Sequence, residues 1–172
     1  DIRIGGGAIL SSRPISGGRC FDRGTFATAT VNLNGQPVDV VALHLGWPWP
    51  SDQWWQIGRL AAPMAMIRGP ALVGGDFNAV SWSAAVSAMA KAGGLDIVDP
   101  IGASWFYRKA PESLRSSLGL EIDHVMVKGG ITVHSARILK DVGSDHAPVL
   151  IEFSLKPEEE RGRPVQTVEA VD

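Results

Sequence analysis

Cysteine is almost absent from this sequence of 172 residues, because Cys20 is its one cysteine. A single thiol excludes an internal disulfide and any zinc site built from cysteines, while it leaves the redox compartment open. Long hydrophobic runs are missing as well, since no apolar stretch approaches the roughly 20 residues of a membrane-spanning helix. We therefore expect neither a disulfide scaffold nor a helical membrane span within these residues.

An excess of charge of either sign is also lacking. The 16 basic and 18 acidic side chains give a formal net charge of −2 at pH 7. No broad cationic surface for gripping many phosphates is therefore expected, and a nucleic acid, which stays possible as a substrate, would have to be held locally. The composition is 45% hydrophobic and 20% charged, which is typical of an ordinary globular domain and not of a disordered chain.

The pattern of apolar residues predicts one mixed α/β domain over residues 1–155 and a mobile tail, rich in proline and glutamate, over residues 156–172. Hairpins outnumber helical crossovers, which favours packed sheets with helices outside them over a doubly wound parallel sheet. Strands are expected at 25–33, 38–43, 71–73, near 97, and at 104–107, 121–127, 131–139 and 147–155.

Two helices are expected between these strands. The first begins at Ser51 or Asp52 and runs to about residue 66, with Pro63 expected to kink it or to end it early. The second begins at Ser81 or Ser83 and stops at a pair of glycines. Every polar cluster of interest follows or ends a predicted strand, which would place the clusters along one shared rim.

The sequence Gly-Gly-Asp-Phe-Asn at residues 74–78 follows one of these strands and carries an acid and an amide two residues apart. Hydrolysis of a phosphoester needs one group that aims and deprotonates the attacking water, and another that bonds a phosphoryl oxygen without adding negative charge. Asp76 and Asn78 have the chemistry for these two roles. The alternative is an Asx-type turn in which both side chains cap the local backbone.

A second motif places Asp145 beside His146 at the entry to the last apolar strand. A histidine there can bond or protonate phosphate oxygens, and the neighbouring carboxylate suits a hard cation such as Mg²⁺. The alternative is a capped turn with a solvated histidine.

Strand alternation separates the neighbours Asp123 and His124, because successive side chains point to opposite faces. Asp123 could orient His146 by accepting its other ring N–H, and His124 is then interpreted as a structural residue. His44 ends a predicted strand and could serve as a second imidazole near a leaving group, although a lone histidine at a strand end is more often a satisfied polar residue.

The order of these motifs along the chain resembles the endonuclease/exonuclease/phosphatase superfamily, over about residues 8–155. Residues 8–15 are similar to the stretch Ala-Ile-Leu-Ser-Arg-x-Pro-Ile of that family. The sequence His-Leu-Gly-Trp-Pro at residues 44–48 resembles a bacterial subgroup that often has an N-terminal membrane anchor. Membership of that subgroup would mean an extracytoplasmic, membrane-anchored location, with the anchor in an upstream region; otherwise a cytoplasmic location is expected.

The resemblance implies an α/β (α+β) fold, the DNase I-like four-layer αββα sandwich, here expected without its first strands. It implies a phosphoesterase dependent on Mg²⁺ or Mn²⁺ that hydrolyses a phosphodiester or phosphomonoester by in-line attack of an activated water. The alternative is a catalytically inactive phosphate-binding or partner-binding module with the same fold.

The resemblance also implies a role for each matching residue. Asp76 would position or deprotonate the water, and Asn78 would hold the phosphate. His146 would contact the scissile phosphoryl group with Asp123 as its orienting partner, and His44 would serve the leaving group.

The metal ligands that the resemblance implies are Asp145 and Asp76. The family's metal-binding glutamate has no counterpart in the expected order, so an upstream segment of the polypeptide is expected to be required for metal binding and activity.

Two further features remain. A zinc hydrolase built from the four histidines is a weaker hypothesis, since no pair has a recognised ligand spacing; these are His44, His124, His134 and His146. Of the 6 tryptophans, Trp47 and Trp49 lie beside His44 and could form a platform for a base or another apolar group. Trp54 and Trp55 are expected to pack in the core.

Overall fold

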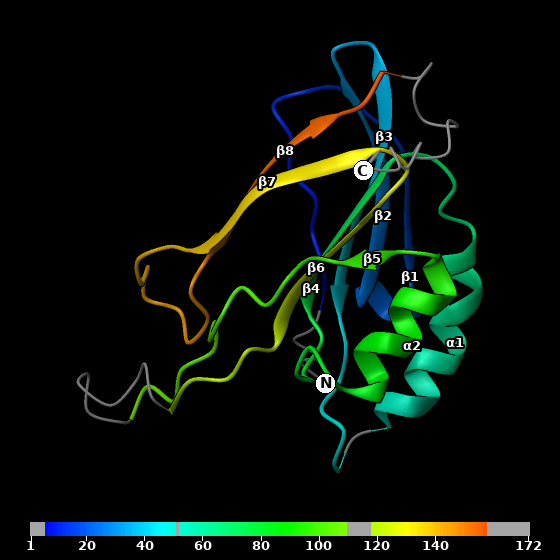
Figure 1. The fold of residues 1–172 in the computed structure, drawn as a ribbon. Helices are drawn as coiled ribbons and strands as arrows, with labels where there is room; N and C mark the ends of the chain where they lie inside the picture. The colour runs from blue at the N-terminus through cyan, green and yellow to red at the C-terminus, as the bar shows by residue number, and fades with distance from the viewer. Residues whose placement is uncertain (1–5, 51, 110–117, 158–172) are drawn as a thin grey trace, which may run out of the picture.

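A six-stranded mixed sheet forms the centre of the computed structural model, which describes residues 6–50, 52–109 and 118–157 (Figure 1). Its strands, in spatial order, are β1 (Ile15–Phe21), β2 (Phe26–Leu33), β3 (Gln36–His44), β4 (Ala71–Asp76), β6 (Asp123–Lys128) and β5 (Asp96–Ile97). The short 3-10 helix η1 (Asp22–Gly24) joins β1 to β2. Strands β3 and β4 pair in parallel, and the other neighbouring pairs are antiparallel.

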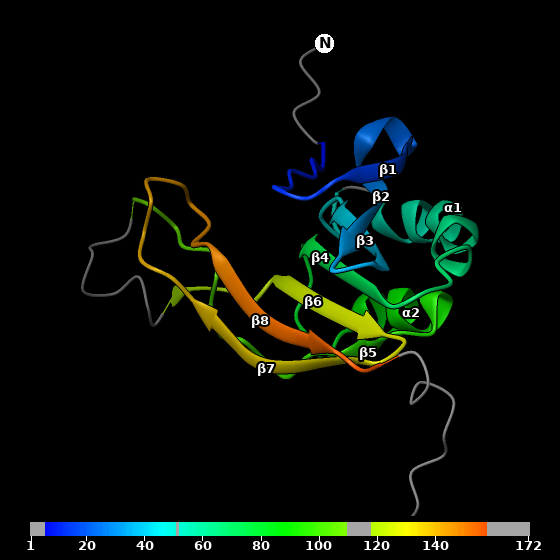
Figure 2. The ribbon, with the colours of Figure 1, turned by 90° about the horizontal axis from the view of Figure 1, so that it is seen from above.

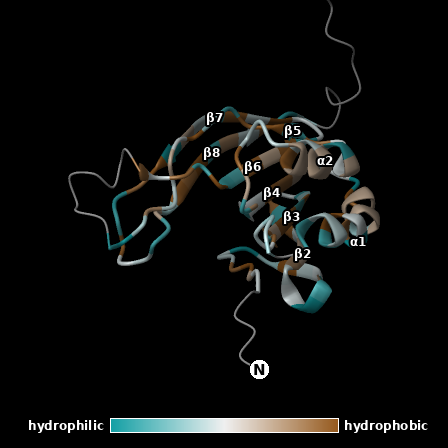
Figure 3. Cartoon of the chain, turned by 90° about the horizontal axis from the view of Figure 1, so that it is seen from below, coloured by the Kyte–Doolittle hydropathy of each residue, from teal (hydrophilic) through white to brown (hydrophobic). Residues whose placement is uncertain are grey.

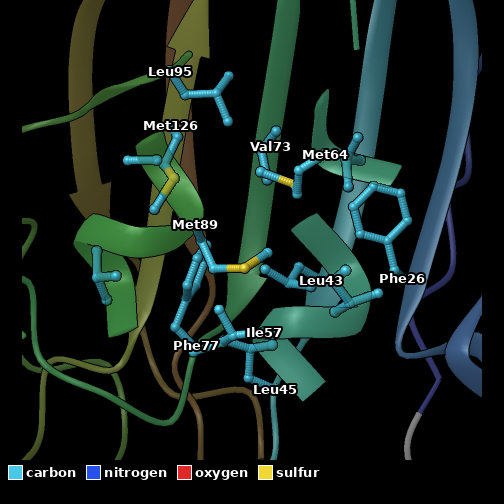
Figure 4. Packing of buried hydrophobic residues seen from close by; sticks show 14 of the residues in the cluster. Phe26, Leu43, Leu45, Ile57, Met64, Val73, Phe77, Met89, Leu95 and Met126 are labelled. Carbon is cyan, nitrogen blue, oxygen red and sulfur yellow. The ribbon is translucent and has the colours of Figure 1, made fainter. Parts of the chain in front are cut away.

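Helices α1 (Gln53–Ala65) and α2 (Ala84–Gly93) lie side by side on one face of this sheet (Figures 1 and 2). The core lies between the sheet and the helices, where apolar residues of β3, β4 and β6 meet those of α1 and α2 (Figure 4). Ser83 caps α2 by accepting a hydrogen bond from the Val86 N–H at 3.2 Å, as one of the expected alternatives. No helix in the described residues is long and apolar enough to cross a bilayer.

A hairpin of β7 (Ile131–Ile138) and β8 (Val149–Leu155) forms a separate two-stranded sheet. It lies on the side of the large sheet away from the helices, near β5 and β6 (Figure 2), and brown hydrophobic stretches run along it (Figure 3). The described residues thus form three layers of the expected four: the helix pair, the large sheet and this hairpin. The α/β class with helices outside packed sheets is confirmed.

The sequence pattern missed or misplaced several elements. Strand β1 was not predicted, because its sequence has two glycines and its residues are almost all exposed, so no apolar alternation marks it. Residues 104–107 form no strand; Trp105 makes only isolated bridges with Leu120 and His146. Pro63 does not end α1 early, since the helix continues to Ala65.

Two tryptophans also lie elsewhere than expected. Trp54 and Trp55 were predicted to pack in the core, but both are exposed in the first turn of α1. The inward positions of that turn are taken by glutamines instead. Ser51, an expected helix cap, and residues 158–172 of the predicted tail lie outside the described residues.

Candidate active site

Three predicted site residues form one row across the large sheet. His44 is the last residue of β3, Asp76 the last of β4 and Asp123 the first of β6. The strand registers pair His44 with Asp76 and Asp76 with Asp123. Residues in register on neighbouring strands point to the same face, so their side chains meet at one end of the sheet, the lower end in Figure 1.

His146 joins this row from the loop before β8. The loop is held by the bridge between Trp105 and His146 and by a 2.7 Å hydrogen bond from the Ala147 N–H to the Ser104 carbonyl. The Nδ1 atom of His146 lies 2.8 Å from Oδ2 of Asp123, the contact predicted for this pair. When Nδ1 carries the proton that Asp123 accepts, Nε2 is left to face the centre of the site.

Asp76 occupies that centre. Its Oδ2 lies 3.6 Å from Nε2 of His44 and 3.8 Å from Nε2 of His146. We call His44, Asp76, Asp123 and His146 the Asp76 cluster. Two imidazoles thus flank a carboxylate whose side chain is only 16% exposed.

The pKa of Asp76 is raised above its ordinary value. Burial is the largest cause, because a carboxylate loses solvation when it is charged away from water, and the negative charge of Asp123 adds to it. The Asn78 backbone N–H, which donates to Oδ1 at 2.7 Å, and the two imidazoles act in the opposite direction. A carboxylate with a raised pKa takes up a proton more readily than an ordinary one, as a general base must.

Gly75 allows β4 to place Asp76 at the centre of the site. Its φ is +151°, and a Cβ at this position would lie 1.8 Å from the carbonyl oxygen of Leu43 on β3. No other residue type fits so close to a neighbouring backbone. The glycine preceding the acid is therefore required by the close approach of β3 to β4.

Asn78 follows at a left-handed φ of 46° and is buried. Its Nδ2 donates to the carbonyl of Leu45 at 2.7 Å, so the amide ties the loop after β4 to the loop after β3. Its Oδ1 is buried and accepts no hydrogen bond from the described residues. Asn78 thus lies next to the Asp76 cluster, and its role in holding phosphate stays a prediction.

Two glutamines that the sequence analysis did not select hold the loops of the site. Gln53 donates to the carbonyls of Gly46 at 2.8 Å and Phe77 at 3.0 Å, and Gln56 accepts from the Gly46 N–H at 2.8 Å. Both are buried in the first turn of α1. Polar residues at the inward positions of an amphipathic helix are the signal that could have identified them.

The two other histidines lie outside the Asp76 cluster, and the contacts of His124 agree with the structural role predicted for it. His124 is buried, its Nε2 lies 2.7 Å from the carbonyl oxygen of Ala79, and its ring packs edge-on against Phe77. His134 lies on β7 beside Ser154. The zinc hypothesis finds no support, because the described residues contain no group of three or more His, Cys, Asp or Glu side chains placed to hold a metal ion.

The two carboxylates predicted to bind Mg²⁺ or Mn²⁺, Asp76 and Asp145, also belong to no such group of ligands in the described residues. Asp145 is exposed, and its Oδ2 accepts a hydrogen bond from the indole N–H of Trp105 at 3.3 Å. Asp76 faces the two imidazoles of the cluster. Mg²⁺ requires well-placed oxygen ligands to offset the cost of removing its water. The described residues alone therefore do not fit a divalent cation.

A pocket of about 270 Å³ opens beside the cluster. His44 lines it on one side, and Trp55, Gln56 and Arg59 of α1 line it on another. The guanidinium of Arg59 lies 3.8 Å from the centre of the Trp55 ring and forms an ion pair with Asp22. A group leaving from a substrate in the cluster could enter this pocket past His44.

Comparison with known proteins agrees with this geometry. A family model described as the Endonuclease/Exonuclease/phosphatase family matches residues 2–146. A UPF0294 protein of Vibrio vulnificus strain YJ016 is 32% identical over 129 residues, which are 71% of this chain and 41% of that protein. The chain thus spans less than half the length of this curated relative.

Two solved structures show the same fold at low identity. An AP endonuclease from Archaeoglobus fulgidus superposes with a TM-score of 0.63 at 15% identity, covering 84% of this chain and 73% of that one. The human Nocturnin catalytic domain superposes with a TM-score of 0.55 at 20% identity, covering 76% and 52%.

Proposed function

The chain belongs to the Endonuclease/Exonuclease/phosphatase family, and on this premise we propose that it is a hydrolase of phosphoric esters. The observation that carries the proposal is the Asp76 cluster: a largely buried carboxylate with a raised pKa, flanked by His44 and by His146, which Asp123 holds. Acid–base groups within reach of one another at one end of a sheet are what a water-activating site requires.

In the proposed reaction, a water molecule attacks the phosphorus in line with the leaving oxygen. Asp76 aims this water and accepts its proton, and the raised pKa favours that transfer. His146, whose Nδ1–H is accepted by Asp123, is doubly protonated in this step and donates a hydrogen bond from Nε2 to a phosphoryl oxygen. Asn78 donates the second hydrogen of Nδ2 to a phosphoryl oxygen, the first being bonded to the Leu45 carbonyl, and His44 gives a proton to the leaving oxygen at the mouth of the adjacent pocket.

A divalent cation, Mg²⁺ or Mn²⁺, belongs to the proposal as a cofactor that neutralises charge on the phosphoryl oxygens when bound. Asp76 and Asp145 are the carboxylates proposed to contact it, and no step above depends on it. We also propose that an upstream segment of the polypeptide supplies a further ligand to this cation. Calorimetric titration of Mg²⁺ into this chain and into a longer one tests this ligand, and the longer chain should bind Mg²⁺ more tightly.

A phosphate-binding or partner-binding module without turnover is the second candidate. The lack of a three-ligand metal group in the described residues favours it. This candidate predicts that inorganic phosphate perturbs the NMR signals of His44 and His146 while no ester is hydrolysed.

The deciding experiment is hydrolysis of bis(p-nitrophenyl) phosphate and p-nitrophenyl phosphate, each with Mg²⁺, with Mn²⁺ and with a chelator. Preference for one ester distinguishes a diesterase from a monoesterase. Turnover that Asp76→Asn abolishes and the exposed control Glu152→Ala retains supports the proposal. No turnover by this chain or by a longer one, under any of these conditions, contradicts it.

A further inference from the structure

All 6 tryptophans of the chain lie at the end of the molecule that carries the Asp76 cluster. We name them the tryptophan rim: Trp47, Trp49, Trp54, Trp55, Trp82 and Trp105. They come from three separate parts of the fold, namely the loop after β3 with the first turn of α1, the loop after β4, and the segment that bridges to His146. Only folding brings these segments to one end.

Contacts at this end connect the parts of the rim. The rings of Trp47 and Trp105 meet edge to face with centroids 6.2 Å apart. Gln53, between the loop after β3 and Trp54, bonds the backbones of both site loops. Trp82 immediately precedes Ser83, the cap of α2, whose N-terminus lies at the same end as that of α1 (Figures 1 and 3). The rim therefore lies at the same end of the large sheet as the Asp76 cluster, and Trp55 also lines the pocket beside His44.

Several tryptophans of the rim are largely exposed, although tryptophan is highly buried on average. Trp49 is 85% exposed, Trp82 is 78% exposed and Trp55 is 63% exposed. Pro48 and Pro50 flank Trp49 and restrict the backbone of its loop, so this side chain is presented on a stiff support. Large exposed apolar side chains gathered on one face mark a contact surface.

The charged side chains near the rim indicate which class of partner it contacts, a nucleic acid or a lipid bilayer. Arg59 pairs with Asp22 and Arg108 pairs with Asp141, so these two cations are already engaged. Asp52 and Asp145 are exposed at the same end. A single-stranded nucleic acid needs a cationic groove along its backbone in addition to stacking platforms, which this arrangement does not favour. Tryptophan has a different preference, for the boundary between lipid and water, where its ring is buried and its N–H stays wet.

We propose that the tryptophan rim rests on the surface of a lipid bilayer and brings the Asp76 cluster to the lipid headgroups. The contact itself does not depend on the proposed hydrolysis. Its consequence for the substrate does rest on the proposed function: the ester cleaved would be a phosphoester at the lipid–water boundary.

The test uses vesicles of pure phosphatidylcholine and the intrinsic fluorescence of the chain, whose tryptophans all belong to the rim. Vesicles should shift the emission to the blue, and brominated phosphatidylcholine should quench it. The variants Trp49→Ala and Trp82→Ala should each weaken partitioning about tenfold, the expected loss for one large apolar side chain that leaves the interface. The control Met66→Ala removes another exposed apolar side chain at the opposite end of α1 and should leave partitioning unchanged.

Four outcomes would overturn the proposal. The first is no vesicle response by the wild-type chain, and the second is equal loss of partitioning in the Met66→Ala control. The third is a response to single-stranded oligothymidylate in place of the vesicle response, and the fourth is burial of the rim in a dimer seen by sedimentation equilibrium.

Hydrolysis of soluble bis(p-nitrophenyl) phosphate is measured in parallel. It should be unchanged within about twofold in Trp49→Ala, whose side chain lies outside the Asp76 cluster. Failure of vesicle binding with intact hydrolysis rejects the lipid contact alone, and failure of hydrolysis with intact vesicle binding rejects the proposed function alone.

Discussion

The substitution Asp76→Asn is predicted to lower activity and raise stability at the same time. Asparagine keeps the size of the side chain and an oxygen that can accept the Asn78 backbone N–H, now bonded at 2.7 Å. It cannot take up the proton of the attacking water. Loss of a general base typically costs a factor of about 10² to 10⁴, so kcat/KM should fall at least about 10²-fold, equivalent to about 2.7 kcal/mol of barrier.

The stability effect follows from the direction of the pKa shift. Because the folded protein raises the pKa of Asp76 above its ordinary value of 3.8, the folded state binds this proton more tightly than the unfolded chain. The stability that protonated Asp76 contributes is therefore fully present below the unfolded pKa and is lost as pH rises through the raised folded pKa. At pH 7 the wild type carries the cost of a buried carboxylate, which the neutral asparagine removes.

The assay is thermal unfolding followed by circular dichroism, with wild type and Asp76→Asn compared at pH 7 and at a pH below 3.8. The variant should have the higher Tm at pH 7, and the difference should shrink at the acidic pH, where Asp76 is protonated in the wild type too. A lower Tm for Asp76→Asn at pH 7 would refute the reasoning, since it would mean that attraction to the two imidazoles outweighs burial. The pH dependence of kcat/KM gives a second check: its acidic limb should lie at higher pH than an ordinary carboxylate would give.

Three further predictions concern the surroundings of Asp76. Gly75→Ala should lower the Tm sharply or prevent folding, because its Cβ would lie 1.8 Å from the Leu43 carbonyl oxygen; an unchanged Tm would contradict the close approach of β3 to β4. Gln53→Leu should destabilise the fold by about 1–3 kcal/mol for each of the two loop carbonyls left without a donor, as measured by urea unfolding, and a variant as stable as wild type would show that these bonds contribute nothing. His146→Ala should reduce kcat/KM by about 10²-fold, whereas Glu152→Ala, on the exposed side of β8, should stay near wild type, and a reversed order of the two would show that the site lies elsewhere.

Much of the fold could be read from local sequence. The apolar pattern predicted a strand at 25–33, which the structure contains as β2, with Ala27, Ala29 and Val31 buried. Ser83 and the glycines after Lys91 marked both ends of α2. These signals work because strand and helix periods and capping chemistry depend on neighbours a few residues apart. Strand β1 was not predicted because its sequence has no strand pattern of its own. It is a strand because it pairs with β2.

The sequence by itself also determined the family and the residue types of the site, since the ordered motifs around Asp76, Asp123 and His146 are contiguous in the chain. It could not show that Asp145 accepts a hydrogen bond from the Trp105 indole, or that Gln53 donates hydrogen bonds to both site loops. Those facts depend on the register of β3, β4 and β6 and on the packing of α1 against their ends. The tryptophan rim has the same origin: three segments far apart in sequence meet only because parallel strands and the helices between them place their loops at one end of a sheet.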